Sequence, residues 1–235
     1  MSDSGGDRLS SLSESFRAKW GERRLAKQIS KLGKWYDPFH GDPRLQSLVD
    51  DIIRDCRISF FVETGTFVGD TTKFVASRHP YVKVLTCEIN RRWYLLARRF
   101  CRGLNNIEFF RGESPTFLAG IRGSLLNERV LFWLDAHWRN HWPLVDETKV
   151  VATLPTYIVL IDDFKVPRRP AFHFDSYNGT PNDLELHSQV MGKECLVPCY
   201  EPDSSCANPA GYGLFMKNMG CASRAGAGTL EKISV

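Results

Sequence analysis

Residues 58–72 read ISFFVETGTFVGDTT, and they are the most informative part of the sequence about the fold class. Its apolar, β-prone start from Ile58 to Val62 predicts a buried strand. The strand runs into a turn that holds two glycines, Gly65 and Gly69, and a helix-forming stretch follows. A buried strand that passes through a glycine turn into a helix is typical of the opening unit of a parallel α/β domain.

Four further apolar runs follow the same plan along the chain. They are VKVLTCEIN (82–90), NIEFFRG (106–112), VLFWLDAHW (130–138) and YIVLIDDF (157–164). Helical stretches such as RRWYLLARRFC (91–101) alternate with them, which predicts an α/β fold with helices on both faces of a mostly parallel sheet. CLVPCYEP (195–202) and YGLFMKN (212–218) would close the sheet as a last strand pair.

Length and composition favour one large domain. The chain has 235 residues, 43% of them hydrophobic, and its net charge of +4 is small beside its 31 basic and 27 acidic residues. This balance does not favour a nucleic-acid partner. There is no signal-like leader, and no apolar window approaches the roughly 20 residues that a membrane helix needs. We therefore expect a cytoplasmic protein without a transmembrane segment.

We divide the chain into an N-terminal extension, residues 1–50, and a domain, residues 51–235. The first 12 or so residues are rich in Ser, Gly and Asp and predict a disordered start. From Leu12 to Leu32, apolar residues at helical spacing alternate with basic ones, which predicts a basic amphipathic helix. That helix has three possible roles: packing on the domain edge, capping an acceptor pocket, or contacting an anionic surface such as RNA or a membrane.

The seven cysteines are interpreted as reduced thiols, because their number is odd. We also consider a zinc site at the four late cysteines, Cys195, Cys199, Cys206 and Cys221. Their spacing lacks a close C-x-x-C pair and a regular set of histidines, so buried and loop thiols are favoured.

The glycine turn carries the first functional signal. Its pattern is E-x-G-x-x-x-G, with Glu63 before Gly65 and Gly69 and no basic residue in the turn. A nicotinamide-type G-x-G-x-x-G turn holds a pyrophosphate, which a carboxylate would repel. Glu88 ends the next strand, where a carboxylate can accept hydrogen bonds from both hydroxyls of a ribose.

Together, these residues resemble motifs one and two of the class I S-adenosylmethionine-dependent methyltransferases. The resemblance covers roughly residues 60–218 and implies a Rossmann-like, seven-stranded sheet. It implies that Gly65 and Gly69 lie against the methionine part of the cofactor, beside Glu63, and that Glu88 holds the ribose. It also implies adenine contacts for Glu113 and Ser114, although Ser114 could instead cap a helix.

Three carboxylates follow neighbouring strands: Asp135 after VLFWL, and Asp162 with Asp163 after YIVLI. Parallel strands place such residues at one edge of the sheet, and hard oxygen ligands there suit Mg²⁺ or Mn²⁺. The arrangement resembles the metal-dependent O-methyltransferases of the catechol type and the macrocin and cephalosporin-biosynthesis group. Helix caps, or cofactor contact by Asp135 alone, are the alternatives to a metal site.

His137 is the preferred general base, and His141 is the alternative. Arg139 stands where the catechol type has its lysine, but a guanidinium is a poor base. The loop RRPAFHFDSYNGTPND (168–183) is expected on the substrate side. Aromatic residues are expected to flank the acceptor: Trp138, Trp142, Phe164, Phe172, Phe174 and Tyr177.

The sequence thus predicts O-methylation of a small ring-containing or sugar-containing acceptor, with Mg²⁺ or Mn²⁺ assisting. Two rival functions remain: an RNA-associated methyltransferase that uses the basic helix, and a noncatalytic, cofactor-binding partner subunit. The oligomeric state, including a homo-oligomer, is left open.

Overall fold

The computed structural model describes residues 37–235 except 138–140, 204–205, 207–208 and 222–225. The expected basic helix therefore lies outside the described residues, as do Trp138 and Arg139. In the part that is described, no helix combines the length and apolar character needed to cross a membrane.

Helices and strands alternate as expected. The order begins η2 (Pro38–Gly41), α2 (Pro43–Asp55), β1 (Phe60–Thr64), α3 (Asp70–Arg78), β2 (Lys83–Glu88), α4 (Arg91–Phe100), β3 (Ile107–Arg111), α5 (Ser114–Ile121) and η3 (Arg122–Leu125). It continues β4 (Val130–Leu134), α6 (Leu144–Ala152), β5 (Tyr157–Ile161), β6 (Ser176–Tyr177), β7 (Thr180–Pro181), α7 (Leu184–Met191), β8 (Glu194–Pro198), β9 (Gly213–Lys217) and β10 (Leu230–Ser234).

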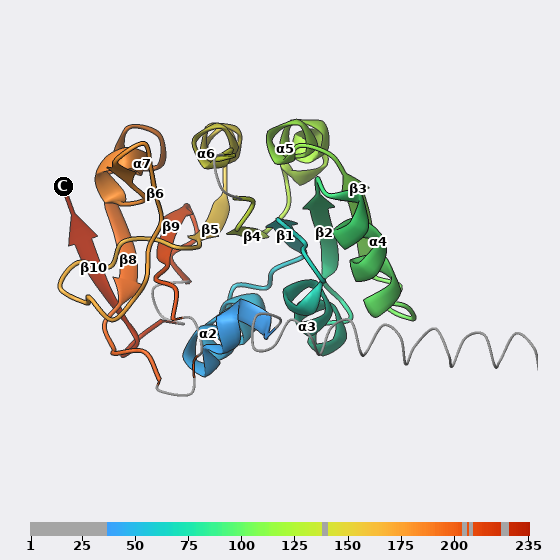
Figure 1. The fold of residues 1–235 in the computed structure, drawn as a ribbon, viewed down its shortest axis with the longest axis horizontal. Coiled ribbons are helices and arrows are strands. Elements are labelled where there is room, and N and C mark those ends of the chain that lie inside the picture. The colour runs from blue at the N-terminus through green and yellow to red at the C-terminus, as the bar shows by residue number, and fades with distance from the viewer. Residues whose placement is uncertain (1–36, 138–140, 204–205, 207–208, 222–225) are drawn as a thin grey trace, which may run out of the picture.

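The main sheet has the strand order β10-β8-β9-β5-β4-β1-β2-β3. The strands from β5 to β3 pair in parallel, and β9, β8 and β10 add antiparallel pairs at the other end. Helices α5, α6 and α7 cover one face, and α2 and α3 lie on the other (Figure 1). The Rossmann-like α/β prediction is confirmed, with eight strands in this sheet rather than seven.

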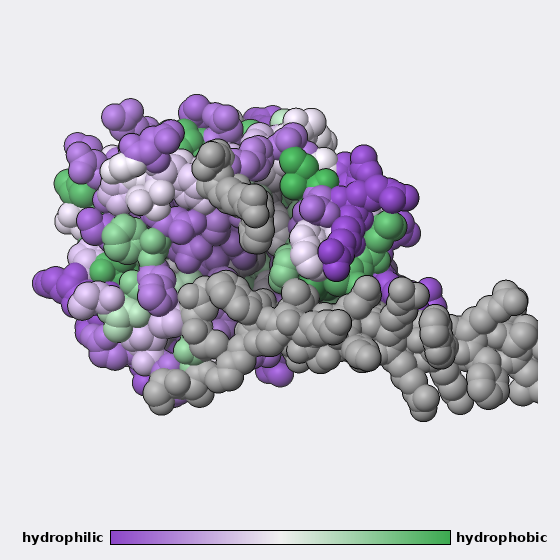
Figure 2. All heavy atoms as spheres, viewed as in Figure 1, coloured by the Kyte–Doolittle hydropathy of each residue, from purple (hydrophilic) through white to green (hydrophobic). Residues whose placement is uncertain are grey.

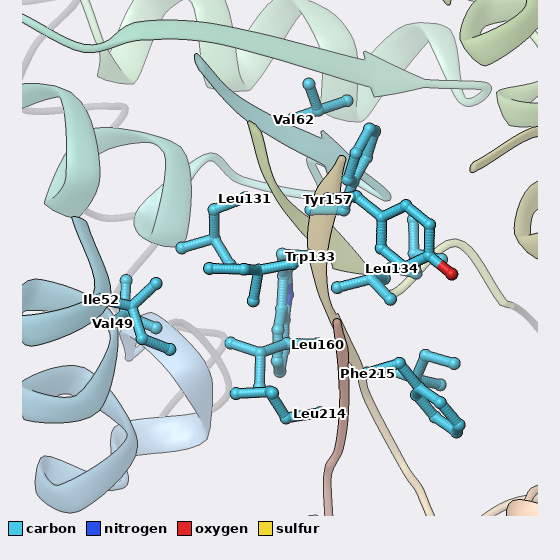
Figure 3. Close-up of a cluster of buried hydrophobic side chains, with 14 of the residues drawn as sticks. Val49, Ile52, Val62, Leu131, Trp133, Leu134, Tyr157, Leu160, Leu214 and Phe215 are labelled. Atoms are coloured by element: carbon cyan, nitrogen blue, oxygen red, sulfur yellow. The ribbon is translucent and has the colours of Figure 1, made fainter. Parts of the chain in front are cut away.

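The core lies on both faces of the central strands. Because side chains alternate along a strand, Leu131 and Trp133 of β4 face α2, whereas Leu134 lies on the opposite side (Figure 3). Val49 and Ile52 of α2 are fully buried against the first face. The parallel strands β4 and β5 are buried at every position, which explains why they are continuous apolar runs in the sequence.

Helix α2 crosses the boundary that we placed between residues 50 and 51. Its N-cap, Asp42, accepts hydrogen bonds from the backbone N–H groups of Arg44 and Leu45. The second Asp42 oxygen accepts from the Tyr200 hydroxyl, 2.6 Å away. This helix therefore packs with the domain, and the described part of the extension belongs to the same core.

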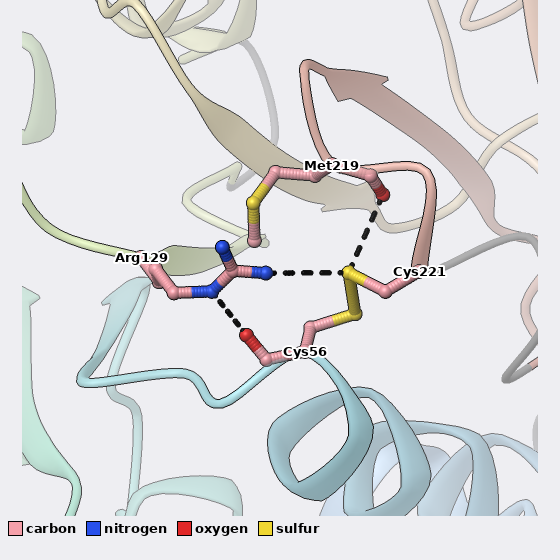
Figure 4. The surroundings of a disulfide bond; sticks show 4 residues. All are labelled: Cys56, Arg129, Met219 and Cys221. Carbon is pink, nitrogen blue, oxygen red and sulfur yellow. Dashed lines mark hydrogen bonds between the residues drawn. A yellow bond between two sulfur atoms is a disulfide. The ribbon is translucent and has the colours of Figure 1, made fainter.

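A disulfide joins Cys56, at the end of α2, to Cys221, which follows β9 (Figure 4). The expectation of seven free thiols is wrong for this pair, whose members lie 165 residues apart in the chain. The Arg129 side chain also connects the two cysteines, because it donates hydrogen bonds to the Cys56 carbonyl oxygen and to the Cys221 sulfur. The remaining late cysteines, within the described residues, do not join a group suited to a metal ion.

Candidate functional site

A cavity of about 320 Å³ opens at the carboxyl ends of β1, β2, β3 and β4. This is the edge at which open α/β sheets bind ligands. Most of the predicted cofactor residues line it, namely Glu63, Gly65, Glu88, Glu113, Ser114 and Asp135. The cavity therefore brings together side chains from four separate strand ends.

The two glycines of the turn have different roles. Gly65 lines the cavity with φ +84°, and a Cβ there would lie 2.3 Å from the Asp135 carbonyl oxygen. Glycine is thus required for the approach of β1 to the loop after β4. Gly69 is not among the lining residues. It caps α3 with φ +84°, where a Cβ would crowd Ala97 and Cys101 of the α4 region, so glycine here allows close contact between the start of α3 and the α4 region.

Glu63 lies at the floor of the cavity and is 2% exposed. Its carboxylate accepts hydrogen bonds from the hydroxyls of Thr86, at 2.6 Å, and Thr72. Burial raises the pKa of Glu63 to about 8, although the two hydroxyls act in the opposite direction. A cationic ligand in the cavity would favour its ionised form.

Glu88 is fixed by the backbone on both sides. One oxygen accepts the Phe67 N–H at 2.8 Å, and the other accepts the Asn90 N–H at 2.7 Å. Burial raises its pKa above the usual range. Each carboxylate oxygen has a second lone pair, so the side chain retains acceptor capacity toward the cavity.

Ser114 does not cap α5 with its side chain, because the N-cap is Glu113 and makes no capping hydrogen bond. The Ser114 hydroxyl is buried at the cavity wall and has no hydrogen-bond partner among the described residues. Behind it lies Glu147 of α6, which is fully buried and whose two oxygens also lack partners there. Burial raises the pKa of Glu147 to about 7. The Ser114 and Thr64 hydroxyls lie close enough to lower it, but no well-aligned hydrogen bond joins them to the carboxyl group. Unpaired polar atoms of this kind indicate a missing ligand or water.

The cavity wall is strongly acidic. Seven of its described residues are carboxylic acids: Asp37, Glu63, Asp70, Glu88, Glu113, Asp135 and Asp163. Lysine and arginine are absent from this described lining, and its basic groups are three histidines. Burial raises the pKa of several of these acids, and each one that is ionised would repel a pyrophosphate and attract a cationic ligand.

The three predicted metal ligands meet at the sheet edge but divide between two groups. Asp135 and Asp162 lie with His40, and their ligand atoms are within 4.8 Å of one another. The His40 Nε2 atom is 2.7 Å from Asp162 Oδ2, and Asp162 is 2% exposed. Burial and the neighbouring Asp162 raise the pKa of Asp135 well above its usual range. Burial acts to raise the pKa of Asp162, but His40, His137 and Asp135 together lower it below its usual range.

Asp163 belongs to the second group, with His137 and Asp175. The His137 Nε2 atom lies 2.9 Å from Asp163 Oδ2 and 3.2 Å from Asp175 Oδ2. Burial alone would lower the pKa of His137, but the surrounding carboxylates, led by Asp163, raise it above 6.5. This network resembles the carboxylate-oriented histidine of a general base.

His141, the alternative base, points elsewhere. Its Nε2 atom pairs with Glu113 Oε2 at 3.0 Å, and both side chains are half exposed. The pair joins the loop after β4 to the end of β3 over the cavity. The geometry therefore favours His137 at the carboxylate cluster.

The predicted aromatic wall is only partly present. Phe164 and Phe172 are buried in the core, and Phe174 is exposed beside Lys165. Trp142 and Tyr177 stack with ring centroids 4.4 Å apart, and the Tyr177 ring lies 6.3 Å from that of His137. Among the described residues, this pair is the aromatic platform beside the carboxylates.

Sequence reasoning missed His40, Asp70, Glu147 and Asp175. His40 lies in a turn and is separated from Asp162 by 122 residues, so no periodicity marks it. Asp70 and Glu147 each stand in the first turn of a helix that follows a strand end, and that position was an available signal. Asp175 lies in the loop already expected on the substrate side.

Comparisons with known proteins show which solved structures have a similar fold. No protein-family model matches the chain, and no curated protein matches it significantly. The O-methyltransferase TomG from Streptomyces achromogenes, involved in tomaymycin synthesis and solved with SAM, aligns with a TM-score of 0.53 and 17% identity, covering 74% of this chain and 79% of TomG. Spermidine synthase from Thermotoga maritima gives 0.52 and 11%, covering 76% of this chain and 62% of that one. At these identities the likeness establishes the shared fold.

Proposed function

We propose that the chain is an S-adenosylmethionine-dependent methyltransferase. The observation that carries the proposal is the conjunction of Glu63, Gly65, Glu88 and Ser114 around one cavity at the carboxyl edge of the sheet. These positions come from the ends of three adjacent strands. TomG, solved with SAM, has the same fold and supports this choice of cofactor.

The residues present fit this cofactor. Its sulfonium and ammonium groups are positive, which matches a wall of seven carboxylic acids without lysine or arginine in its described part. Glu88 has acceptor capacity for ribose hydroxyls, and Ser114 has a buried hydroxyl without a partner. A nicotinamide dinucleotide would bring a pyrophosphate into the same acidic surroundings.

The reaction would be an in-line displacement at the methyl carbon. A bond forms from an acceptor oxygen to the methyl group as the sulfur–methyl bond breaks, and the electron pair stays on sulfur. His137 would take the acceptor's proton, and Asp163 and Asp175 would stabilise the resulting imidazolium. The raised pKa of His137 makes it a stronger base, and its neutral form becomes available only as pH rises through that raised pKa.

We further propose O-methylation of a ring-containing or sugar-containing acceptor with help from a divalent ion. Asp135, Asp162 and Asp163 offer hard oxygen ligands, and the buried Asp162 Oδ1 atom has no partner among the described residues. An ion such as Mg²⁺ or Mn²⁺, when bound, would lower the pKa of the acceptor hydroxyl. The Trp142–Tyr177 platform provides a flat apolar surface for a ring.

The proposed function is tested with methyl-labelled S-adenosylmethionine and a panel of phenol, catechol, sugar and amine acceptors. Label transfer to a hydroxyl acceptor, lost in EDTA and restored by Mg²⁺ or Mn²⁺, is the expected result. If label transfer were undiminished after exhaustive chelation, and elemental analysis found no bound metal, the divalent ion would be removed from the proposal. Cofactor binding without transfer to any acceptor would favour the noncatalytic partner subunit.

A second candidate is methylation of RNA. Four arginines of α4 are exposed, namely Arg91, Arg92, Arg98 and Arg99, and hydrophilic residues lie beside hydrophobic ones on the surface over this helix (Figure 2). Trp93 of the same helix lines the cavity, so a polyanion bound along α4 would reach its mouth. RNA binding that weakens steeply with salt, and that is lost when these arginines become glutamine, would favour this function.

A further inference from the structure

The turn before α2 holds His40 in an unusual backbone conformation. Phe39 and His40 both have positive φ values, 51° and 57°, in the left-handed region that favours glycine. Phe39 is 1% exposed and packs edge-on against Trp133 of β4 and Phe74 of α3, with centroids 5.1 and 5.7 Å away. A buried aromatic anchor thus maintains a strained turn, and strain of this kind is concentrated at functional sites.

The turn places the His40 imidazole on the carboxylates at the ends of β4 and β5. Its Nε2 atom lies 2.7 Å from Asp162 Oδ2, and Asp135 offers a third ligand atom within 4.8 Å of both. A second, independent observation concerns Asp162. Its Oδ1 atom is buried and has no hydrogen-bond partner among the described residues. A buried carboxylate oxygen is costly to leave unpaired, and a cation would satisfy it.

The neighbouring group of His137, Asp163 and Asp175 differs. Asp163 and Asp175 each place an oxygen within 3.2 Å of His137 Nε2, whereas Asp135 lies farther away, 3.7 Å from Nδ1 of the same ring. Asp175 also accepts a hydrogen bond from the Tyr177 hydroxyl at 2.8 Å. This group is fitted to hold and orient an imidazole rather than to surround an ion.

We propose that His40, Asp135 and Asp162 form a mixed nitrogen and oxygen site for a divalent transition-metal ion, while Asp163 orients His137. The proposal refines the metal site of the proposed function. Imidazole suits transition metals, whereas Mg²⁺ and Ca²⁺ prefer oxygen ligands throughout. The site therefore selects ions such as Mn²⁺ over Mg²⁺.

The experiment is Mn²⁺ binding to the EDTA-treated full chain, followed by electron paramagnetic resonance. The wild type should bind Mn²⁺ in preference to Mg²⁺, and pulsed spectra should contain a ¹⁴N coupling from a directly bound imidazole. His40→Gln should remove that coupling and weaken Mn²⁺ binding by at least about tenfold. The control, His137→Gln, should keep both. His40→Asn serves as a second variant if His40→Gln does not fold.

Absence of saturable Mn²⁺ binding, or a ¹⁴N coupling that survives loss of His40 and disappears with His137, would overturn the assignment. Titration of the same EDTA-treated samples with S-adenosylhomocysteine separates the two proposals. Normal S-adenosylhomocysteine affinity without an Mn²⁺ site rejects the metal site alone. Lack of S-adenosylhomocysteine binding counts against the proposed function, whatever the Mn²⁺ result.

Discussion

Glu88→Gln is the substitution that best isolates the proposed ribose contact. Glu88→Ala would also strip acceptors from the Phe67 and Asn90 N–H groups, which bond to the carboxylate at 2.8 and 2.7 Å. Glutamine keeps the shape and one carbonyl oxygen but loses the charge and one acceptor. Its effect on the turn is therefore smaller than that of alanine.

The expected loss follows from hydrogen-bond strengths. Bonds to a charged acceptor contribute about 1.5 to 3 kcal/mol, roughly twice a neutral bond. Weakening a two-bond ribose contact in this way should cost about 1 to 2 kcal/mol, or roughly 5- to 30-fold in affinity. Loss of one backbone bond should lower the free energy of unfolding by about 1 kcal/mol.

Calorimetric titration with S-adenosylhomocysteine measures the affinity, and thermal denaturation measures the stability. Glu108→Gln is the matched control, because Glu108 lies on the adjacent strand β3, is half exposed and pairs with Lys83 away from the cavity wall. Its affinity should equal that of the wild type. A folded Glu88→Gln protein with unchanged affinity would refute the ribose assignment.

Two further predictions concern the glycine turn and its floor. Gly65→Ala should lower the free energy of unfolding by about 2 to 4 kcal/mol, since the left-handed φ is strained and the new Cβ meets a carbonyl oxygen. Gly103→Ala is the control, because Gly103 also has a left-handed φ, +94°, but a Cβ there would have no atom within 4 Å. If the Gly65→Ala and Gly103→Ala proteins had equal melting temperatures, the clash with the carbonyl oxygen would be excluded as a cause of destabilisation. Because the folded pKa of Glu63, about 8, exceeds its usual 4.5, its contribution to stability is full below pH 4.5 and is lost as pH rises through 8. The cationic cofactor should correspondingly bind more tightly from pH 6 to 8.5, and Glu63→Gln should flatten both trends; unchanged slopes in that variant would contradict the role of Glu63.

The strand ends were predictable because parallel topology determines where they lie. The runs that became β1, β2, β4 and β5 are largely buried, so each is a continuous apolar stretch, and the residue at its end must emerge at the carboxyl edge of the sheet. Glu88, Asp135 and Asp162 were found in this way. The adjacency of Asp135 and Asp162 follows from the pairing of β4 with β5.

What the sequence did not reveal depends on long-range packing. His40 reaches Asp162 through a strained turn anchored by Phe39, and the Cys56–Cys221 bridge closes 165 residues. Neither leaves a local pattern in the chain. The edge strand β10 was missed for a different reason: it is only partly buried and its sequence, LEKIS, mixes charged and apolar residues.

Binding of S-adenosylmethionine in the acidic cavity is tested by calorimetric titration of the full chain with S-adenosylmethionine, S-adenosylhomocysteine and NAD⁺ in the same buffer. We expect saturable, one-to-one binding of the first two ligands and none of the dinucleotide, whose pyrophosphate would face the carboxylates of the wall. Binding of NAD⁺ with no binding of either adenosyl ligand would contradict this expectation.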